Sequence, residues 1–340
     1  MRGGPGRGGK LTSIGGRRPA LCGLIFSLAL PVSSAWSQGA PAPRAHHHLV
    51  HHAGDGRVYL VGGSTSRGDA YQYFDDVWAW TGTGWQLAGS LPFPRSSHGL
   101  VYHAGRGSLV LFGGGSERTF AADGALWEWR GGEWSRLGGN PEAGRAEPGL
   151  CYDAKRERIV AFGGWDGADT PSGVTWEWTG RDLVAQDVPG PSPRAGHALV
   201  YDPVRERCLL VGGRGEEGFL ADTWEWDGAA WQRIDAAGPS PRWFFGAAAD
   251  TVGERIVLFG GNGPDGDLGD TWIWDGQGWS LLVRDGPEPR GSARLAFDGE
   301  GVLLFGGRTL VPGGFRDHGD TWRLQGDVWT LVAPPPGSGE

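Results

Sequence analysis

A pair of adjacent glycines recurs six times in this chain, each time at the end of an aliphatic run. The pairs are Gly62-Gly63, Gly113-Gly114, Gly163-Gly164, Gly212-Gly213, Gly260-Gly261 and Gly306-Gly307. Neighbouring pairs lie 46 to 51 residues apart. An internal period of this length is typical of repeat proteins, in which copies of one small unit pack side by side.

Tryptophans mark the same repeat in three further registers. The first register holds Trp78, Trp127, Trp176, Trp224, Trp272 and Trp322. The second, two residues later, holds Trp80, Trp129, Trp178, Trp226 and Trp274, with Leu324 in the last repeat. The third holds Trp85, Trp134, Trp231, Trp279 and Trp329, with Leu183 in repeat three. Together they contain 16 of the 19 tryptophans, so the unusual Trp content belongs to the repeat itself.

Each repeat is predicted to contain four short strands. In the fourth, residues 197–201 form the first strand, and the apolar run from Arg207 to Gly212 forms a second one buried on both faces. Trp224 and Trp226 alternate with Glu225, so both indoles point to one side of a third strand. An Asp-Gly turn then leads to a fourth strand at residues 231–234.

Four strands repeated six times predict an all-β fold, a six-bladed β-propeller of four-stranded antiparallel blades. A flat sheet of that many strands would expose long edges, whereas a propeller hides its inner edges around a channel. Indoles burying about 200 Å² each would pack between blades. The glycine pairs would lie where a neighbouring indole or backbone comes too close for a Cβ. Each blade is complete within one segment, so blade six would close the ring on blade one, as its weakest joint.

The predicted domain boundaries follow from the repeat. The propeller spans residues 43–333, with blades at 43–92, 93–142, 143–191, 192–239, 240–287 and 288–333. Residues 1–37 form a predicted signal peptide, with five positive charges, an apolar run from Ala20 to Leu30 and small residues before Gln38. An uncleaved anchor is the alternative. Residues 38–42 are a short linker and residues 334–340 a disordered tail.

Removing the signal peptide takes away five positive charges and changes the formal net charge from −8 to −13. Such a surface repels phosphate backbones, so we expect no nucleic-acid partner. We expect a secreted or periplasmic monomer that has no membrane contact after cleavage. Cys151 and Cys208 fall in different strands of adjacent blades, which favours two buried thiols over a disulfide bridge.

The glycine pairs, the spaced tryptophans and two Pro-Arg-x-x-His segments together resemble the kelch repeat. The two segments are residues 94–98 and 193–197, and the resemblance covers residues 43–333. It implies the propeller fold, but it leaves function open, because kelch propellers include scaffold and ligand-binding proteins, copper oxidases similar to galactose oxidase, and exported sugar epimerases resembling the sialic-acid mutarotases. Many relatives pair strands from both termini, which this chain does not do.

No catalytic constellation stands out. The copper chemistry would need a Tyr crosslinked to a Cys with a second Tyr and two His, and neither Cys151 nor Cys208 has such neighbours in the sequence. The chain also lacks a nucleophile elbow, zinc spacing and a phosphate loop. We therefore expect no cofactor, and no enzyme is favoured.

A binding site is expected on one rim of the propeller, where the loops between strands are longest. From the second glycine to the first Trp there are 15 residues in blades one and six, and 11 to 13 elsewhere. This rim would carry one arginine per blade: Arg44, Arg95, Arg145, Arg194, Arg242 and Arg290. They could hold an acidic ligand. The alternative is structural, with Asp76, Asp222, Asp270 and Asp320 pairing with them from blade to blade.

Residues that break the repeat are the other candidates. Trp165 and Trp243 lie outside the three Trp registers, and a sugar ring could stack on them. Their alternative role is to pack loops or plug the channel. His47, His98 and His197 follow the arginines at equivalent positions, and the cluster of residues 46–52 suggests a metal. A structural role for these histidines is favoured, and no metal site is predicted. Two Asp-Gly segments, at residues 166–169 and 265–267, hint only weakly at calcium.

The sequence thus predicts an exported, non-enzymatic binding module for a carbohydrate or a protein ligand. Its ligand candidates are the six arginines, Trp165, Trp243 and His197. The alternative is a periplasmic sugar epimerase that uses the same rim.

Overall fold

The computed structural model describes residues 39–68, 70–116, 124–166, 170–282 and 285–337. The predicted signal peptide, residue 38 of the linker and the last three residues of the tail lie outside this range. The described residues all belong to one compact unit, Trp36–Glu340. They contain strands and two short 3-10 helices, η1 (Ala104–Arg106) and η2 (Pro141–Ala143), and no helix long and apolar enough to cross a membrane.

Six four-stranded antiparallel sheets form the blades, as the sequence predicts. Blade 1 consists of β1 (His48–His52), β2 (Arg57–Val61), β5 (Asp76–Trp80) and β6 (Trp85–Ser90); blade 2 of β7 (Ser96–His103), β8 (Ser108–Gly115), β9 (Ala125–Arg130) and β10 (Glu133–Gly139); blade 3 of β11 (Gly149–Asp153), β12 (Arg158–Phe162), β13 (Thr175–Trp178) and β14 (Leu183–Gln186). Blade 4 consists of β15 (Ala198–Asp202), β16 (Arg207–Gly215), β17 (Gly218–Trp226) and β18 (Trp231–Ile234); blade 5 of β19 (Gly246–Asp250), β20 (Arg255–Gly263), β21 (Gly266–Trp274) and β22 (Trp279–Leu282); blade 6 of β23 (Arg294–Phe297), β24 (Val302–Phe305), β27 (Thr321–Gln325) and β28 (Val328–Ala333). We call the four strands of each blade a to d, in chain order.

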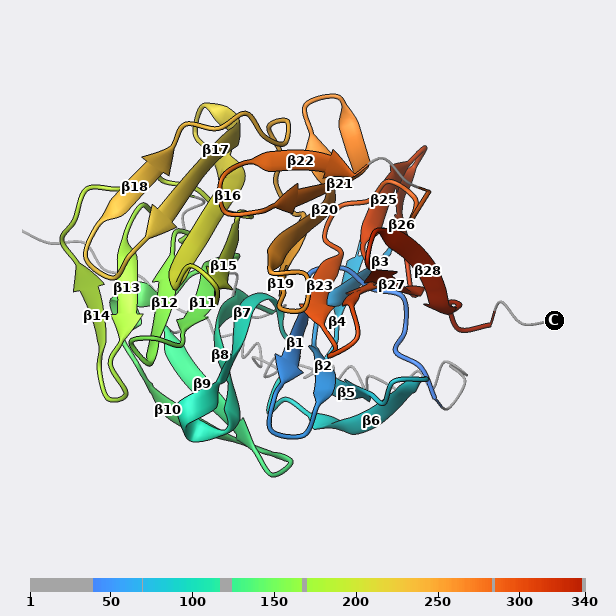
Figure 1. Cartoon of the computed structure of the whole chain (residues 1–340). Coiled ribbons are helices and arrows are strands. Elements are labelled where there is room, and N and C mark those ends of the chain that lie inside the picture. Colours follow the sequence, from blue (N-terminus) through green and yellow to red (C-terminus); the bar gives the residue numbers. More distant parts are fainter. Residues whose placement is uncertain (1–38, 69, 117–123, 167–169, 283–284, 338–340) are drawn as a thin grey trace, which may run out of the picture. The chain divides into compact units, whose positions relative to one another are not determined.

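The a strands line the centre of the ring (Figure 1). Each contacts the a strand of the next blade, and β1 contacts β23, so the ring is closed. Every blade comes from one continuous segment, and no strand is exchanged between the ends of the described chain. The architecture is therefore a closed six-bladed propeller.

The glycine pairs and the repeated arginines form one joint that recurs between all blades. A Cβ on the first glycine would lie 2.3 to 3.0 Å from the carbonyl oxygen of the next blade's arginine. The second glycine donates its N–H to that same oxygen. The six bonds are Gly63 to Arg95 (2.8 Å), Gly114 to Arg145 (2.9 Å), Gly164 to Arg194 (2.8 Å), Gly213 to Arg242 (2.8 Å), Gly261 to Arg290 (3.0 Å) and Gly307 to Arg44 (2.9 Å). The closest neighbour of the first glycine in each pair is therefore a backbone carbonyl oxygen and not an indole.

The indoles of the d strands do pack between blades. Four of them donate Nε1–H to the threonine that precedes the first-register Trp in strand c of the preceding blade: Trp85 to Thr321 (2.9 Å), Trp231 to Thr175 (2.9 Å), Trp279 to Thr223 (3.0 Å) and Trp329 to Thr271 (3.0 Å). Three of these rings also lie against other glycines, for example Trp231 against Gly190. Burial of so large a side chain stabilises the interface by several kcal/mol, at about 25 cal/mol per Å².

The seam between blades 6 and 1 has an additional link on the long-loop rim. The long b–c loops of these two blades each fold into a hairpin, β3 (Ser64–Arg67) with β4 (Ala70–Tyr73), and β25 (Arg308–Val311) with β26 (Gly314–Asp317). Asp317 accepts hydrogen bonds from the Thr65 hydroxyl and the Ser66 N–H, both at 2.8 Å. The two hairpins are thus tied together across the seam.

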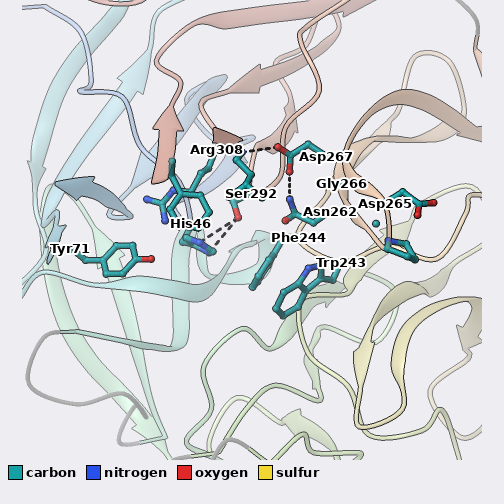
Figure 2. Close-up of a pocket in the computed structure, with 14 residues that line it drawn as sticks. His46, Tyr71, Trp243, Phe244, Asn262, Asp265, Gly266, Asp267, Ser292 and Arg308 are labelled. Carbon is teal, nitrogen blue, oxygen red and sulfur yellow. Dashed lines mark hydrogen bonds between the residues drawn. The ribbon is translucent and has the colours of Figure 1, made fainter. Parts of the chain in front are cut away.

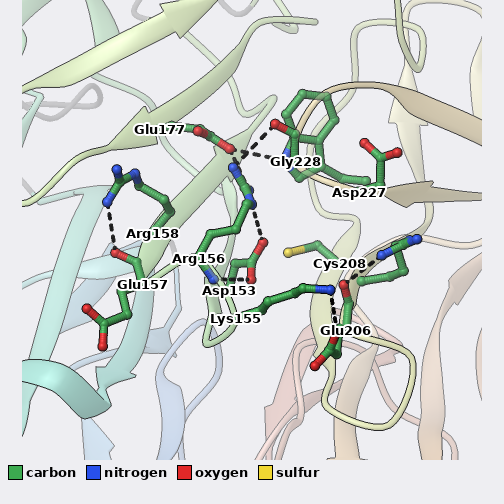
Figure 3. A network of polar contacts seen from close by, with 12 residues as sticks. Asp153, Lys155, Arg156, Glu157, Arg158, Glu177, Glu206, Cys208, Asp227 and Gly228 are labelled. Carbon is green, nitrogen blue, oxygen red and sulfur yellow. Dashed lines mark hydrogen bonds and ion pairs between the residues drawn. The ribbon is translucent and has the colours of Figure 1, made fainter.

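The opposite rim, formed by the short turns, lacks such a link at the seam. Arg156 on the a–b turn of blade 3 bonds to Asp153 and Glu177, both at 2.7 Å, and reaches the Gly228 carbonyl of blade 4 (Figure 3). Arg205 and Arg255 reach the c–d turns of blades 5 and 6 in the same way. The a–b turn of blade 6 has no arginine. The a–b turn of blade 1 has no arginine either, so this rim does not single out the closing joint, and its weakness stays a prediction.

Cys151 on β11 and Cys208 on β16 are both buried free thiols, in agreement with the sequence prediction. Their positions in different strands of adjacent blades do not keep them apart, because their Sγ atoms lie 2.6 Å from each other. The two strands face each other across the interface of blades 3 and 4. Burial raises the pKa of the Cys151 thiol well above its usual value, which keeps it protonated.

Candidate functional site

Six residues form a ring around the channel mouth, each two positions after a repeated arginine. They are His46, Ser97, Glu147, Gly196, Phe244 and Ser292, and φ is between 53° and 63° in all six. Five consecutive N–H to carbonyl bonds run around this ring: Ser97 to His46 (2.9 Å), Glu147 to Ser97 (2.7 Å), Gly196 to Glu147 (3.4 Å), Phe244 to Gly196 (2.8 Å) and Ser292 to Phe244 (2.5 Å). We call this set the mouth ring. A left-handed conformation costs a non-glycine residue about 1–2 kcal/mol, and such strain concentrates at functional sites.

A second set of variable residues surrounds the mouth ring, each directly after a glycine pair. They are Ser64, Gly115, Trp165, Arg214, Asn262 and Arg308. Each forms a β-bridge with the residue that follows the arginine of its own blade, as Trp243 does with Asn262. The large side chains of both sets come mainly from blades 3 to 6, so they are unevenly distributed around the mouth.

A pocket of about 600 Å³ on this rim lies over blades 5, 6 and 1. Four aromatic rings line it: Tyr71, Trp243, Phe244 and Phe315. Figure 2 shows Trp243 and Phe244 side by side, with Asn262 and Asp267 next to them. Asp267 accepts hydrogen bonds from Asn262 and from the Leu310 N–H (2.8 Å), while Asp265 is exposed. We call this cavity the large pocket.

Arg308 makes one wall of the large pocket rigid. Its guanidinium donates two hydrogen bonds to Asp317, at 2.6 and 3.2 Å, and lies 5.2 Å from the Tyr71 ring and 5.1 Å from the Phe315 ring. Because Asp317 also holds the hairpin of blade 1, both Arg308 and Asp317 are already engaged within the protein. This wall therefore offers a ligand the aromatic rings of Tyr71 and Phe315, and little unpaired charge.

A second pocket of about 500 Å³ adjoins the first over blades 3 to 5. Trp243 and Phe244 are stacked at 4.0 Å and line both pockets, so they form a partition between them. Arg214 lies 5.0 Å from the Trp243 ring. Its guanidinium makes no hydrogen bond or ion pair with any residue that the structure describes. Trp165 and Glu147 complete this second pocket.

Four of the repeated arginines are buried and bound to carboxylates. The pairs are Arg44 with Asp76, Arg194 with Asp222, Arg242 with Asp270 and Arg290 with Asp320, with Nη2 to Oδ2 distances of 2.8, 2.9, 2.8 and 3.1 Å. These arginines are at most 1% exposed. Each aspartate also accepts the indole N–H of the first-register Trp of its blade, at 2.7 Å. The arrangement fits the structural alternative, but each pair lies within one blade, not between two.

In blades 2 and 3, Ala125 and Val174 stand at the repeat position of this aspartate. Arg95 donates to the Gly113 carbonyl (2.6 Å), and Arg145 to those of Glu142 (3.0 Å) and Gly144 (2.7 Å). The indole nitrogens of Trp127 and Trp176 have no partner in these blades. None of the six arginines lines the large pocket or the second pocket.

His47, His98 and His197 pack against the glycine pairs of the preceding blades. A Cβ on Gly306 would lie 2.9 Å from His47, and the His47 ring meets the Phe305 ring edge-on at 5.4 Å. Pro148, Phe245 and Ala293 fill the same position in the other blades. Burial lowers the pKa of all three histidines, so they are neutral. This is the structural role that the sequence favours.

No three metal-ligating side chains come together within the described part of the chain. The histidines of residues 46–52 diverge: His46 faces Phe244, and His51 faces Phe297. Of the two weak calcium segments, Asp267 is engaged as described above, and residues 167–169 lie outside the described residues.

Glu147 is the one titratable residue of the mouth that sequence reasoning missed and whose pKa is raised. Burial raises it to about 7, against the opposing effects of the Arg294 charge, Ser97 and Trp165. One of its oxygens accepts from the Ser97 hydroxyl at 3.2 Å, and the other has no partner. Arg214, Asn262 and Arg308 were missed as well. Their fixed distance from the glycine pair and the arginine is the signal that could have identified all of these positions.

A family model described as the KLHDC2/KLHL20/DRC7 Kelch-repeats domain matches residues 172–337, from the second half of blade 3 to the end of blade 6. No curated protein sequence matches the chain. The same joint is present in all six blades, and together with this match it supports a kelch-repeat β-propeller. Propellers of this kind commonly act as protein-binding modules.

Proposed function

We propose that this propeller binds a segment of a partner protein across the channel mouth, with side chains of the segment seated on either side of the Trp243–Phe244 partition. Two adjoining pockets that share one aromatic wall are the observation that carries this proposal. An extended segment directs every second side chain to the same face, so residues i and i+2 of the partner can enter two adjacent cavities on one rim.

The chemistry around the pockets supports a protein partner. Tyr71, Leu310 and Phe315 are 45%, 65% and 45% exposed and stand on the hairpins beside the large pocket. Exposed apolar side chains next to a pocket are typical of interaction surfaces. The uncommitted Arg214 in the second pocket is suited to a carboxylate of the partner, and the exposed Asp265 in the large pocket to a basic group.

A carbohydrate ligand is the second candidate. The exposed face of Trp243 beside Asn262 and Asp267 offers a flat ring and polar groups together, the combination that sugar recognition requires. Enzymatic epimerisation is a weaker alternative. It is favoured only by Glu147, whose pKa of about 7 suits proton transfer at neutral pH.

The test is binding to a random peptide display library and to a glycan array, followed by affinity measurement on the selected probe. Trp243→Ala should weaken binding about 30-fold or more, because buried aromatic anchors contribute about 2 kcal/mol or more. Val252→Ser, on the opposite rim, is the matched control and should have no effect. Peptide binding that survives Trp243→Ala would contradict the proposal, and binding to glycans alone would favour the second candidate.

We also propose that the chain is exported, on the strength of its N-terminal sequence. Expression with export to the periplasm should yield a protein that begins at Gln38, and its intact mass identifies the cleavage site. If it is exported, oxidation can join the adjacent Cys151 and Cys208, which would lower that mass by two hydrogens. Recovery of the full-length, membrane-bound chain would instead support the uncleaved anchor.

A further inference from the structure

Inside the mouth ring, the central channel contains a small cavity of about 70 Å³ that residues of all six blades line. The residues relevant to its chemistry are His48, His98, Glu147, His197, Phe245 and Arg294. One water needs roughly 10–15 Å³ of such cavity volume, so this cavity has room for a few waters or for one small ion.

Arg294, at the start of β23, provides the positive charge of this cavity. Its Nε donates to the His47 carbonyl and its Nη1 to the Phe245 carbonyl, both at 3.2 Å, so it is fixed between blades 1 and 5. It has no ion pair with any described carboxylate, and its Nη2 has no hydrogen-bond partner among the described residues. The Arg294 side chain is partly buried, and desolvation lowers its pKa, so an anion beside the unpartnered Nη2 would offset that cost.

The histidines around Arg294 supply further donors. Both ring nitrogens of His98 and of His197 are buried without a partner. Burial lowers the pKa of His48 and of His197 to about 3, and that of His98 well below its usual value, so each ring is neutral. A neutral imidazole carries one N–H, which can point toward an acceptor in the cavity.

We propose that this cavity binds a small monovalent anion of halide size, held by the guanidinium of Arg294 and by imidazole N–H groups. The inference can be separated from the rim ligand, because the proposed anion contacts neither Trp243 nor Arg214, although Glu147 lines both this cavity and the second pocket. No other described cluster combines an unpaired cation, unpartnered buried donors and a cavity of this size.

Glu147 should make the affinity depend on pH. It is the only carboxylate lining the cavity, and its pKa of about 7 means that it is protonated below neutrality and charged above it. A charged Glu147 repels the anion, so affinity should fall as the pH rises through 7. The titratable and charged groups that face it across the mouth and channel are His46, His48, His98, His197, Arg214, Glu216 and Arg294. Burial keeps the pKa values of these histidines well below this range, so they stay neutral while the charge of Glu147 changes.

The experiment uses the full chain in halide-free buffer, with sodium bromide as the probe and thermal unfolding as the readout. We expect a saturable rise in the unfolding midpoint with bromide, and an affinity about tenfold weaker at pH 8.5 than at pH 6. Glu147→Gln should abolish the pH dependence. Arg294→Gln should abolish the saturable response, whereas Arg233→Gln, at an exposed position on β18, should not.

Crystals soaked in bromide provide a readout that does not depend on any variant. We expect an anomalous bromine peak on the channel axis within hydrogen-bond distance of the Arg294 guanidinium. An empty channel at saturating bromide, or an unchanged response in Arg294→Gln, would overturn the proposal. Trp243→Ala should leave bromide binding intact, which separates a failure of this site from a failure of the rim site.

Discussion

Replacing Arg194 with methionine is expected to destabilise the propeller by about 3 kcal/mol or more, because it leaves the partly buried Asp222 carboxylate without its counter-ion. The Gly212 carbonyl loses a hydrogen bond from the guanidinium at the same time. In a chain of this size the thermal midpoint should fall by roughly 6 °C or more, measured by calorimetry or circular dichroism.

Arg145→Met is the matched control for Arg194→Met. Arg145 occupies the equivalent place in blade 3 but has no carboxylate partner, so its loss should cost no more than about 1 kcal/mol. The pH dependence provides a second check. The Arg194 ion pair lowers the pKa of Asp222, so its stabilisation is present above the unfolded pKa of about 3.9 and is lost as the pH falls through the lower folded value. Equal destabilisation by both variants would show that the carboxylate pairing is unimportant.

Gly163→Ala should have a still larger effect and prevent stable folding. The new Cβ would lie 2.3 Å from the Arg194 carbonyl oxygen and 2.9 Å from His197 Cε1, inside the joint between blades 3 and 4. The oxygen cannot retreat without breaking its hydrogen bond with Gly164. We expect a loss above about 4 kcal/mol, at the upper end of single substitutions, seen as insoluble protein or a much lower urea midpoint.

Gly131→Ala separates this clash from backbone strain. Gly131 has φ of 61°, against 65° at Gly163, but no atom lies within 4 Å of where its Cβ would be. It should therefore cost only the left-handed conformation of alanine, about 1–2 kcal/mol. If the two variants behaved alike, the φ angle and not the contact between blades would explain the glycine pairs.

The blade number and strand order could be predicted because each repeated residue type has one physical role in every copy. Periodicity locates a residue within a blade, but it does not show which neighbour faces it. Gly163 was expected to meet an indole or a backbone segment, and it meets the carbonyl of Arg194. Likewise, the four aspartates were correctly associated with the arginines, but the pairing direction, within a blade, depends on side-chain reach that the sequence does not contain.

The site was harder to predict because its residues share position and not chemistry. The mouth ring has histidine, serine, glutamate, glycine and phenylalanine at one repeat position, so no residue type identifies it. Its common property is a left-handed backbone, which only the structure shows. Trp243 was noticed because it departs from the Trp registers, whereas Glu147 and Arg214 look like ordinary surface residues in the sequence.

The repeated joint has a consequence for how such a protein can change. The hydrogen bonds of this joint link main-chain atoms of each glycine pair to the next blade's arginine carbonyl, and no side chain after a glycine pair or in the mouth ring takes part in them. In the proposed binding mode, specificity would therefore depend on residues of the same short segments that do not form this joint. Blade by blade, evolution or an engineer can exchange the recognition side chains for a new partner without disturbing the frame that presents them.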